Sequence, residues 1–259
     1  MKTFRIIGMV LMAIVMGVNF TSCKPNNNEE EPTKKLVKFS YDIVETTFKY
    51  DDQGRLIESV EVQKEDSSLF TTAYTYVWGD NTIEFTHSIN GNVCGNHTLI
   101  LENGLLTKLD SVYPFFDSTY TYNASGRVVK CEGFFSSRSF KWNDDRLIEK
   151  KIVSKSNTNI QTYAYETNAT TKGYNPLISR SVIANDLFTA HPELTGTKSQ
   201  QLFSSNHNYT IFYSDNEEYD YTLNYKYEFD EDGYVNKAIV TYDTEEGEVV
   251  NEIYTMVWE

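Results

Sequence analysis

Residues 221–235 read YTLNYKYEFDEDGYV and join a strand pattern to a turn pattern. Aromatic or leucine side chains occupy every second position from Tyr221 to Phe229, which is the period of a strand packed on one face and wet on the other. The Asp-Glu-Asp-Gly that follows is typical of a tight reversal, since Asp opens a type I turn and Gly adopts the left-handed conformation that closes it. The stretch therefore predicts two antiparallel strands joined by a hairpin.

The same unit recurs along the chain. Tyr50–Leu56 (YDDQGRL) and Tyr122–Val128 (YNASGRV) repeat it, and shorter forms begin at Trp78 and Trp142. The two-residue period continues almost unbroken from residue 37 to the end, and helical spacing is nearly absent. We therefore predict an all-β fold, an antiparallel up-and-down meander of about 12–15 strands that forms a barrel-like or strongly curved sheet. Further turns are expected at Asn90–Asn92, Asn103-Gly104 and Ser136-Ser137.

One segment, residues 167–208, breaks this rhythm. We predict a short helical or irregular insert near 184–204, in which Asn185 or Asp186 caps a short helix that Pro192 ends. A curved sheet of about 14 strands leaves a wide interior or an open mouth. We expect the insert to cover or plug that space through its apolar side chains, and the alternative is an exposed loop. These side chains are Leu187, Phe188, Leu194, Leu202 and Phe203.

The N-terminal segment has the features of an export signal. Lys2 and Arg5 precede an apolar run that is too short to span a bilayer, and Phe20-Thr21-Ser22-Cys23 resembles the lipobox of bacterial lipoproteins, whose Cys is acylated. We predict a lipoprotein signal peptide over 1–22, Cys23 as the lipid-anchor residue, a polar acidic tether over 23–36 and a single β-domain over 37–259. The alternative is ordinary cleavage, with Cys23 as a bystander.

The order of these features is similar to that in a known family. The aromatic-Asp turns resemble the YD/RHS repeat. Together with the lipobox, Asn175-Pro176-Leu177 and residues 227–235, they look closer to Bacteroidetes lipoproteins labelled as a domain of unknown function, the DUF4595 type. The resemblance implies a porin-like β-barrel in a lipoprotein, and it implies no activity.

The charge of the chain limits the partners and the location that we expect. The chain has 23 Lys+Arg against 37 Asp+Glu and a formal net charge of −14, which repels nucleic acid. Because an acidic chain gains nothing from anionic lipid, we expect acyl chains to hold it to the outer membrane of the cell envelope. The acidic run from Glu29 resembles a surface-export signal, or else is a plain spacer, so the side of the membrane stays open. Strand 147–153 carries charge on both faces, which favours a soluble, tethered barrel over a spanning one.

Motifs for catalysis or cofactor binding are missing, so we expect no enzyme activity and no cofactor. His87 and His97 can face each other across a hairpin, but they make only half a zinc site, so no metal is expected. The recurring acidic turns lack the spacing of calcium loops. Two strands are expected between Cys94 and Cys131, about 14 Å at 4.8 Å a step, which predicts no disulfide.

These observations favour a non-catalytic binding or structural module in the envelope, with a glycan or an envelope protein as a possible partner. The alternative is a cell-surface glycan- or small-ligand-binding lipoprotein, recognised by an exposed Tyr/Trp cluster near the barrel mouth. The 19 Tyr support that alternative because a phenol ring offers both an apolar face and a polar tip, although Tyr also simply suits half-buried strands. The ligand-binding residues are unknown from sequence.

Overall fold

The computed structural model describes residues 34–259 apart from 66–67, 112–116, 183–185, 214–216 and 245–246. The predicted signal peptide, Cys23, most of the tether and Asn185 lie outside the described residues. Residues 34–259 form one structural unit. Its first strand begins at Leu36, a buried residue within the predicted tether.

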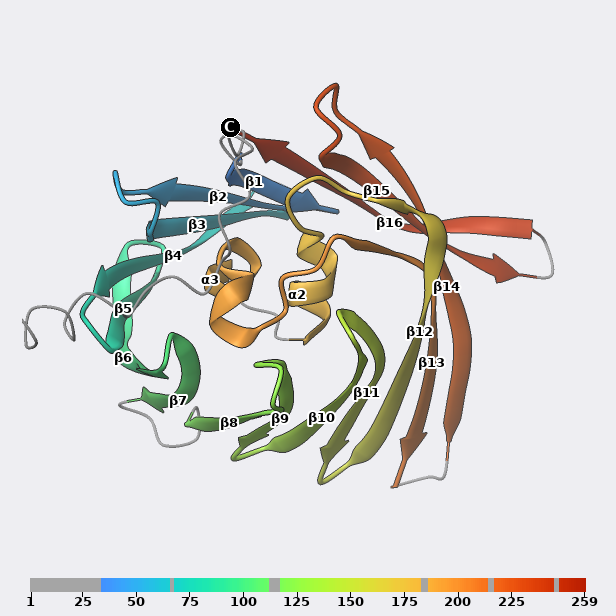
Figure 1. Cartoon of the computed structure of the whole chain (residues 1–259), viewed down its shortest axis with the longest axis horizontal. Coiled ribbons are helices and arrows are strands. Elements are labelled where there is room, and N and C mark those ends of the chain that lie inside the picture. Colours follow the sequence, from blue (N-terminus) through green and yellow to red (C-terminus); the bar gives the residue numbers. More distant parts are fainter. Residues whose placement is uncertain (1–33, 66–67, 112–116, 183–185, 214–216, 245–246) are drawn as a thin grey trace, which may run out of the picture. The chain divides into compact units, whose positions relative to one another are not determined.

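An antiparallel meander forms a closed barrel within the described chain, as the alternation predicts (Figure 1). Each strand pairs with its neighbour in the sequence, and β1 pairs with β16 to close the ring. The strands number sixteen rather than about 12–15, because some, such as β8, are shorter than a sequence pattern resolves. They are β1 Leu36–Tyr41, β2 Val44–Tyr50, β3 Leu56–Glu65, β4 Ser68–Trp78, β5 Thr82–Ile89, β6 Asn92–Glu102, β7 Leu105–Ser111, β8 Ser118–Tyr122, β9 Val128–Gly133, β10 Ser136–Asn143, β11 Arg146–Ser154, β12 Asn157–Thr170, β13 Gln201–Phe212, β14 Glu218–Phe229, β15 Val235–Thr244 and β16 Gly247–Trp258.

The recurring aromatic residue before each turn has a structural task. Six aromatic residues, four of them directly before a hairpin turn, donate their polar tip to a backbone carbonyl at or near the start of the preceding strand. Trp78 Nε1 donates to Leu56 O at 2.7 Å, and Tyr50 Oη donates to Leu36 O at 2.6 Å. Buried Tyr and Trp need such partners, and the contact fixes the ring against the inside of the wall. The other donors are Tyr122, Trp142, Tyr165 and Trp258.

The Asp or Asn after the aromatic residue closes the turn. Asp51 Oδ1 accepts the backbone N–H groups of Gln53 and Arg55, and Asn123 Oδ1 makes the same pair of bonds in its turn. Gly126 then has a φ of 73°, as the left-handed position requires. The turn chemistry predicted from the repeats is confirmed.

The insert between β12 and β13 lies inside the barrel (Figure 1). It comprises α2 (Pro176–Val182), α3 (Asp186–Ala190) and the 3₁₀ turn η2 (Pro192–Thr195). The five apolar side chains expected to fill the interior are buried: Leu187, Phe188 and Leu194 in the insert, and Leu202 and Phe203 on β13. The plug prediction is therefore confirmed, and the exposed-loop alternative is wrong. The predicted end of the insert at 204 is too late, because the wall resumes at Gln201.

Polar contacts tie this plug to the wall. The buried His191 ring accepts the N–H of Leu56 on β3 at Nε2, 2.9 Å away, and its Nδ1 lies 2.6 Å from Glu193 Oε1. From the β8–β9 turn, Arg127 Nη1 donates to Gly196 O at 2.7 Å. Hydrogen bonds at both sides of the insert hold it in one position in the barrel.

Two local predictions need correction. The turn expected at Ser136-Ser137 lies at Phe134-Phe135, so two apolar residues occupy the position where polar ones were sought. Helix α2 was not predicted. Asn175 Oδ1 accepts the N–H of Leu177 at 3.1 Å and Pro176 opens the helix, so Asn-Pro acts as a start signal there.

No helix in the described part of the chain is both long and apolar enough to cross a membrane.

Candidate functional site: a polar cavity beside the plug

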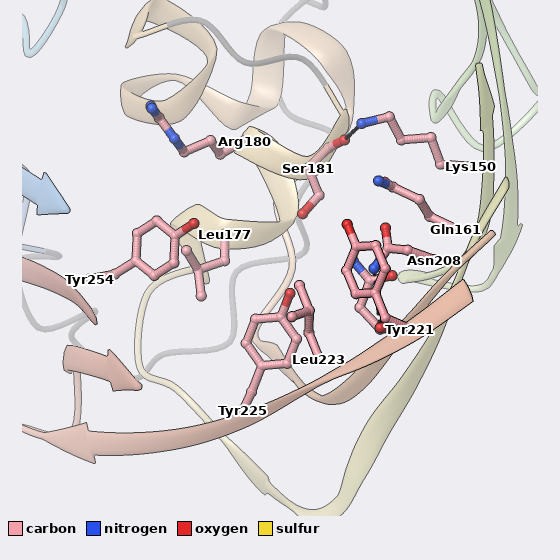
Figure 2. A pocket seen from close by; sticks show the side chains of 11 residues that line it. Lys150, Gln161, Leu177, Arg180, Ser181, Asn208, Tyr221, Leu223, Tyr225 and Tyr254 are labelled. Carbon is pink, nitrogen blue, oxygen red and sulfur yellow. Dashed lines mark hydrogen bonds between the residues drawn. The ribbon is translucent and has the colours of Figure 1, made fainter. Parts of the chain in front are cut away.

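A cavity of about 310 Å³ lies between α2 and the inner faces of β11–β14 and β16. Figure 2 shows its lining side chains gathered from helix and wall around one space. Amides, phenols and two cations predominate over apolar groups. The lining residues are Lys150, Gln161, Leu177, Arg180, Ser181, Asn206, Asn208, Tyr221, Leu223, Tyr225 and Tyr254.

Strand register places four of these side chains in one row. Lys150 of β11 pairs with Gln161 of β12, Gln161 pairs with Asn208 of β13, and Asn208 pairs with Tyr221 of β14. Directly paired residues in neighbouring strands project to the same face, about 5 Å apart. The row therefore presents an ammonium group, two amides and a phenol, in that order, across the barrel wall.

A second row lies beside the first. Asn206 pairs with Leu223, two positions from the Asn208–Tyr221 pair and on the same inner face. Asn206 is buried, and its Oδ1 has no hydrogen-bond partner among the described residues, whereas its side chain hydrogen bonds with Tyr225. An amide oxygen without a partner at a cavity wall is a free acceptor for a ligand hydroxyl.

Lys150 enters the cavity from β11. Its Nζ donates to Ser181 O of α2 at 2.6 Å (Figure 2). Burial, and to a smaller extent the charge of Arg138, lower the pKa of this amine to about 8. Within the described residues it makes no ion pair.

Arg180 faces another part of the interior. Its guanidinium lies over the rings of Tyr41 and Phe39, 4.5 and 5.1 Å from their centroids, and Figure 2 shows it directed away from Lys150. Its charge also acts on the buried Asp186, whose pKa burial raises to about 6. Arg180 therefore interacts with the rings of Phe39 and Tyr41 and with Asp186, and not with the row that begins at Lys150.

The phenols are neutral donors at neutral pH. Burial raises the pKa of Tyr225 to about 12. It also raises the pKa of Tyr254, whose hydroxyl hydrogen bonds to Glu252. Tyr221 is 48% exposed, so its ring offers an open face at the edge of the cavity. Rings, phenol hydroxyls and amides together are the groups that bind polyhydroxylated molecules.

The candidate residues singled out from the sequence lie elsewhere. His87 pairs with Gly95 and His97 with Phe85, because the hairpin turns on two residues, so the histidines are diagonal rather than opposite. They stack on Tyr74 and Phe85 instead. Among the described residues, no three His, Cys, Asp or Glu come together to hold a metal ion.

The cysteines follow the predicted strand order. Cys94 lies on β6 and Cys131 on β9, with β7 and β8 between them, and both thiols are free. Burial raises the pKa of the Cys131 thiol, which makes it a weak nucleophile.

Sequence reasoning missed the cavity. Lys150 was noticed only as a charge that interrupts an apolar strand, and the amides were not noticed at all. The available signal was a run of inward positions that carry Asn or Gln between aromatic ones, at 159, 161, 206 and 208.

Comparison with known proteins supports the fold. No family model matches the chain, and no curated protein matches it. The chain is similar to a porin-like protein from Bacteroides uniformis, with a TM-score of 0.60, 14% identity, and coverage of 88% of this chain and 99% of that one. A match to the Tc holotoxin pore of Photorhabdus luminescens has a TM-score of 0.18 and 13% identity, covering 81% of this chain and 11% of that one, and carries no argument. The DUF4595 and lipoprotein assignments stay predictions.

Proposed function

We propose that this protein is a non-catalytic envelope lipoprotein, anchored to the outer membrane through Cys23, whose plugged barrel binds a small polyhydroxylated ligand such as a sugar. The observation that carries the binding role is the row Lys150, Gln161, Asn208 and Tyr221 on the wall of the cavity. Between the two roles left open by the sequence, this row favours ligand binding over a purely structural one.

The size of the cavity suits a small molecule. Its volume of about 310 Å³ is at the lower end of the range for ligand pockets, about 300–1,000 Å³. The plug occupies the interior beside it, and α2 supplies one side of the lining. Because of this volume, we expect a ligand of one or two rings rather than a long chain.

The outer wall supports a tethered barrel. Its outward side chains include the ion pairs Lys49–Glu58 at 3.0 Å and Lys141–Glu149 at 2.8 Å. A charged group that faces lipid at the bilayer midplane costs about 2–4 kcal/mol, and these strands carry several. The export signal and the likeness to a porin-like Bacteroides protein support an envelope location.

A thermal-shift screen tests the binding role. The mature chain with Cys23→Ser is melted alone and with a panel of mono- and disaccharides. A ligand at a hundredfold excess over its Kd adds about 2.7 kcal/mol to the free energy of unfolding, a rise of roughly 5–10 °C in Tm. Asn208→Ala should abolish the shift, because the side chain lies in the row.

Asn224→Ala is the matched control, since Asn224 is on the outward face of β14, next to Leu223. It should keep the full shift. If no sugar in the panel raises the Tm, the binding role is wrong and a structural role in the envelope replaces it.

A further inference from the structure

We infer that the ligand of this cavity is an acidic sugar, whose carboxylate pairs with the ammonium group of Lys150 while its hydroxyls bind the neighbouring amides. The inference rests on the proposed binding function and adds the charge and the substrate class of the ligand.

Lys150 lacks a counter-ion among the described residues. Its ammonium group is withdrawn from water, has one hydrogen bond to a backbone carbonyl, and makes no ion pair within the described chain. The charged group that acts on it, Arg138 on the neighbouring strand β10, repels it. A buried cation is costly unless an anion satisfies it, so a charge of opposite sign is the partner that this position lacks.

The lining of the cavity contains no acidic side chain. The whole chain has a formal net charge of −14, yet none of the eleven lining residues is an Asp or Glu. The acids whose charges act on groups around the cavity have partners: Glu252 hydrogen bonds with Tyr254, and the charge of Arg180 acts on Asp186. A lining with two cations and no carboxylate favours an anionic ligand.

The polar groups beside Lys150 favour a sugar acid over a simple anion. Gln161 and Asn208 follow Lys150 in the same row, and the free Oδ1 of Asn206 adds an acceptor beside them. These groups match hydroxyls rather than a second charge. Tyr221 at the end of the row offers a ring face for the apolar side of a pyranose. A ligand that fills the row therefore has a carboxylate at one end and a hydroxylated ring beyond it.

Three probes test this by isothermal titration of the mature Cys23→Ser protein. Glucuronate carries the ring and the carboxylate, glucose carries the ring alone, and acetate carries the carboxylate alone. We expect glucuronate to bind at least tenfold more tightly than glucose, and acetate to compete weakly. Equal Kd values for glucuronate and glucose would overturn the inference and leave the proposed binding function standing. Failure of all three probes to bind would overturn both.

Variants at two positions of β11 test whether Lys150 causes the preference for glucuronate. Lys150→Gln should reduce the preference for glucuronate over glucose at least tenfold. Lys150→Arg should keep most of the preference because it keeps the charge. Lys151→Gln is the matched control, because Lys151 projects from the opposite face of β11. An unchanged preference in Lys150→Gln would contradict the inference. If that variant does not fold, the wild-type contrast between glucuronate and glucose decides the question alone.

Discussion

At the scale of single residues, two glycines with positive φ allow the cost of a close contact to be measured apart from the cost of backbone strain. A Cβ at Gly196 would lie 1.8 Å from Gly126 O, whereas a Cβ at Gly91 would meet nothing within 4 Å. The left-handed conformation alone costs an alanine about 1–2 kcal/mol. We expect Gly91→Ala to lower the free energy of unfolding by that amount and Gly196→Ala to lower it by about 3–5 kcal/mol, since the plug must also move. Urea unfolding of both variants measures this, and equal losses would show that η2 does not press on the β8–β9 turn.

Asp186 makes the plug sensitive to pH. Burial and the charge of Glu61 raise its pKa to about 6, against the opposing charge of Arg180. A carboxyl whose folded pKa exceeds its unfolded value of about 3.9 binds protons more tightly in the folded state, so stability falls as pH rises from about 4 to 6. We expect Asp186→Asn to remove this fall and to stabilise the protein at pH 7 by up to about 3 kcal/mol.

Melting curves of the wild type and Asp186→Asn between pH 4 and pH 7 measure the effect. The Glu84→Gln variant is the control, because Glu84 is an exposed residue of β5. A pH dependence that persists in Asp186→Asn would assign the titration to another group.

At the scale of elements, the sequence predicts the strands and the turns but not which face of each strand points inward. The reason is a bulge just after the turn in six hairpins, where one extra residue of the second strand has no partner in the first. Trp142 pairs with Leu147 and Lys141 with Glu149, so Ile148 is skipped and the alternation changes phase. Read without the bulge, Lys150 shares a face with Ile148. With it, Lys150 and Leu147 are both inward.

The bulge in β11 is one reason why the cavity was not foreseen, because it alone turns Lys150 inward. The row also joins residues of four strands, whose pairing partners the two-residue period does not give. The plug was predictable because it only required a break in the rhythm and apolar side chains within it. The turn at Phe134-Phe135 was not predictable, because phenylalanine is not a residue that turns favour. Its two side chains are 64% and 60% exposed.

Replacement of the plug tests its contribution as an element. Thr171 N donates to Gln200 O at 2.9 Å, so the ends of the insert lie side by side and a short Gly/Ser linker can replace residues 172–198. Each large apolar side chain buried contributes about 1.5–3 kcal/mol, so the loss of Leu177, Ile178, Leu187 and Phe188 should cost more than about 5 kcal/mol. We also expect the opened interior to bind the dye ANS.

The control places the same linker in the Asn90-Gly91 turn. That turn joins an odd strand to an even one, whereas the insert joins an even strand to an odd one, so the two lie at opposite ends of the barrel. It should change neither the Tm nor dye binding. A plug-less barrel that melts like the wild type would show that the wall is stable alone.

At the scale of the whole molecule, the barrel has its apolar side within. Phe39, Leu56, Tyr76 and Phe203 are buried inside, whereas Lys and Glu pair along the outside. A lipid-spanning barrel needs the reverse, an apolar outer band and a polar lumen. The likeness to a porin-like protein is one of backbone architecture, and because Lys–Glu pairs lie on its outer side we expect the wall to face water.

Phase partition in Triton X-114 tests this division between barrel and anchor. We expect the wild type, expressed with its signal peptide in a bacterium that acylates lipoproteins, to enter the detergent phase, because acyl chains carry the only strong affinity for lipid in this scheme. Cys23→Ser should stay in the aqueous phase as a folded protein, since Lys49 and Lys141 would each cost about 2–4 kcal/mol at the middle of a bilayer. If Cys23→Ser still enters the detergent phase, the wall itself contacts lipid. If the wild type stays in water, Cys23 is not acylated, and the envelope placement loses its anchor.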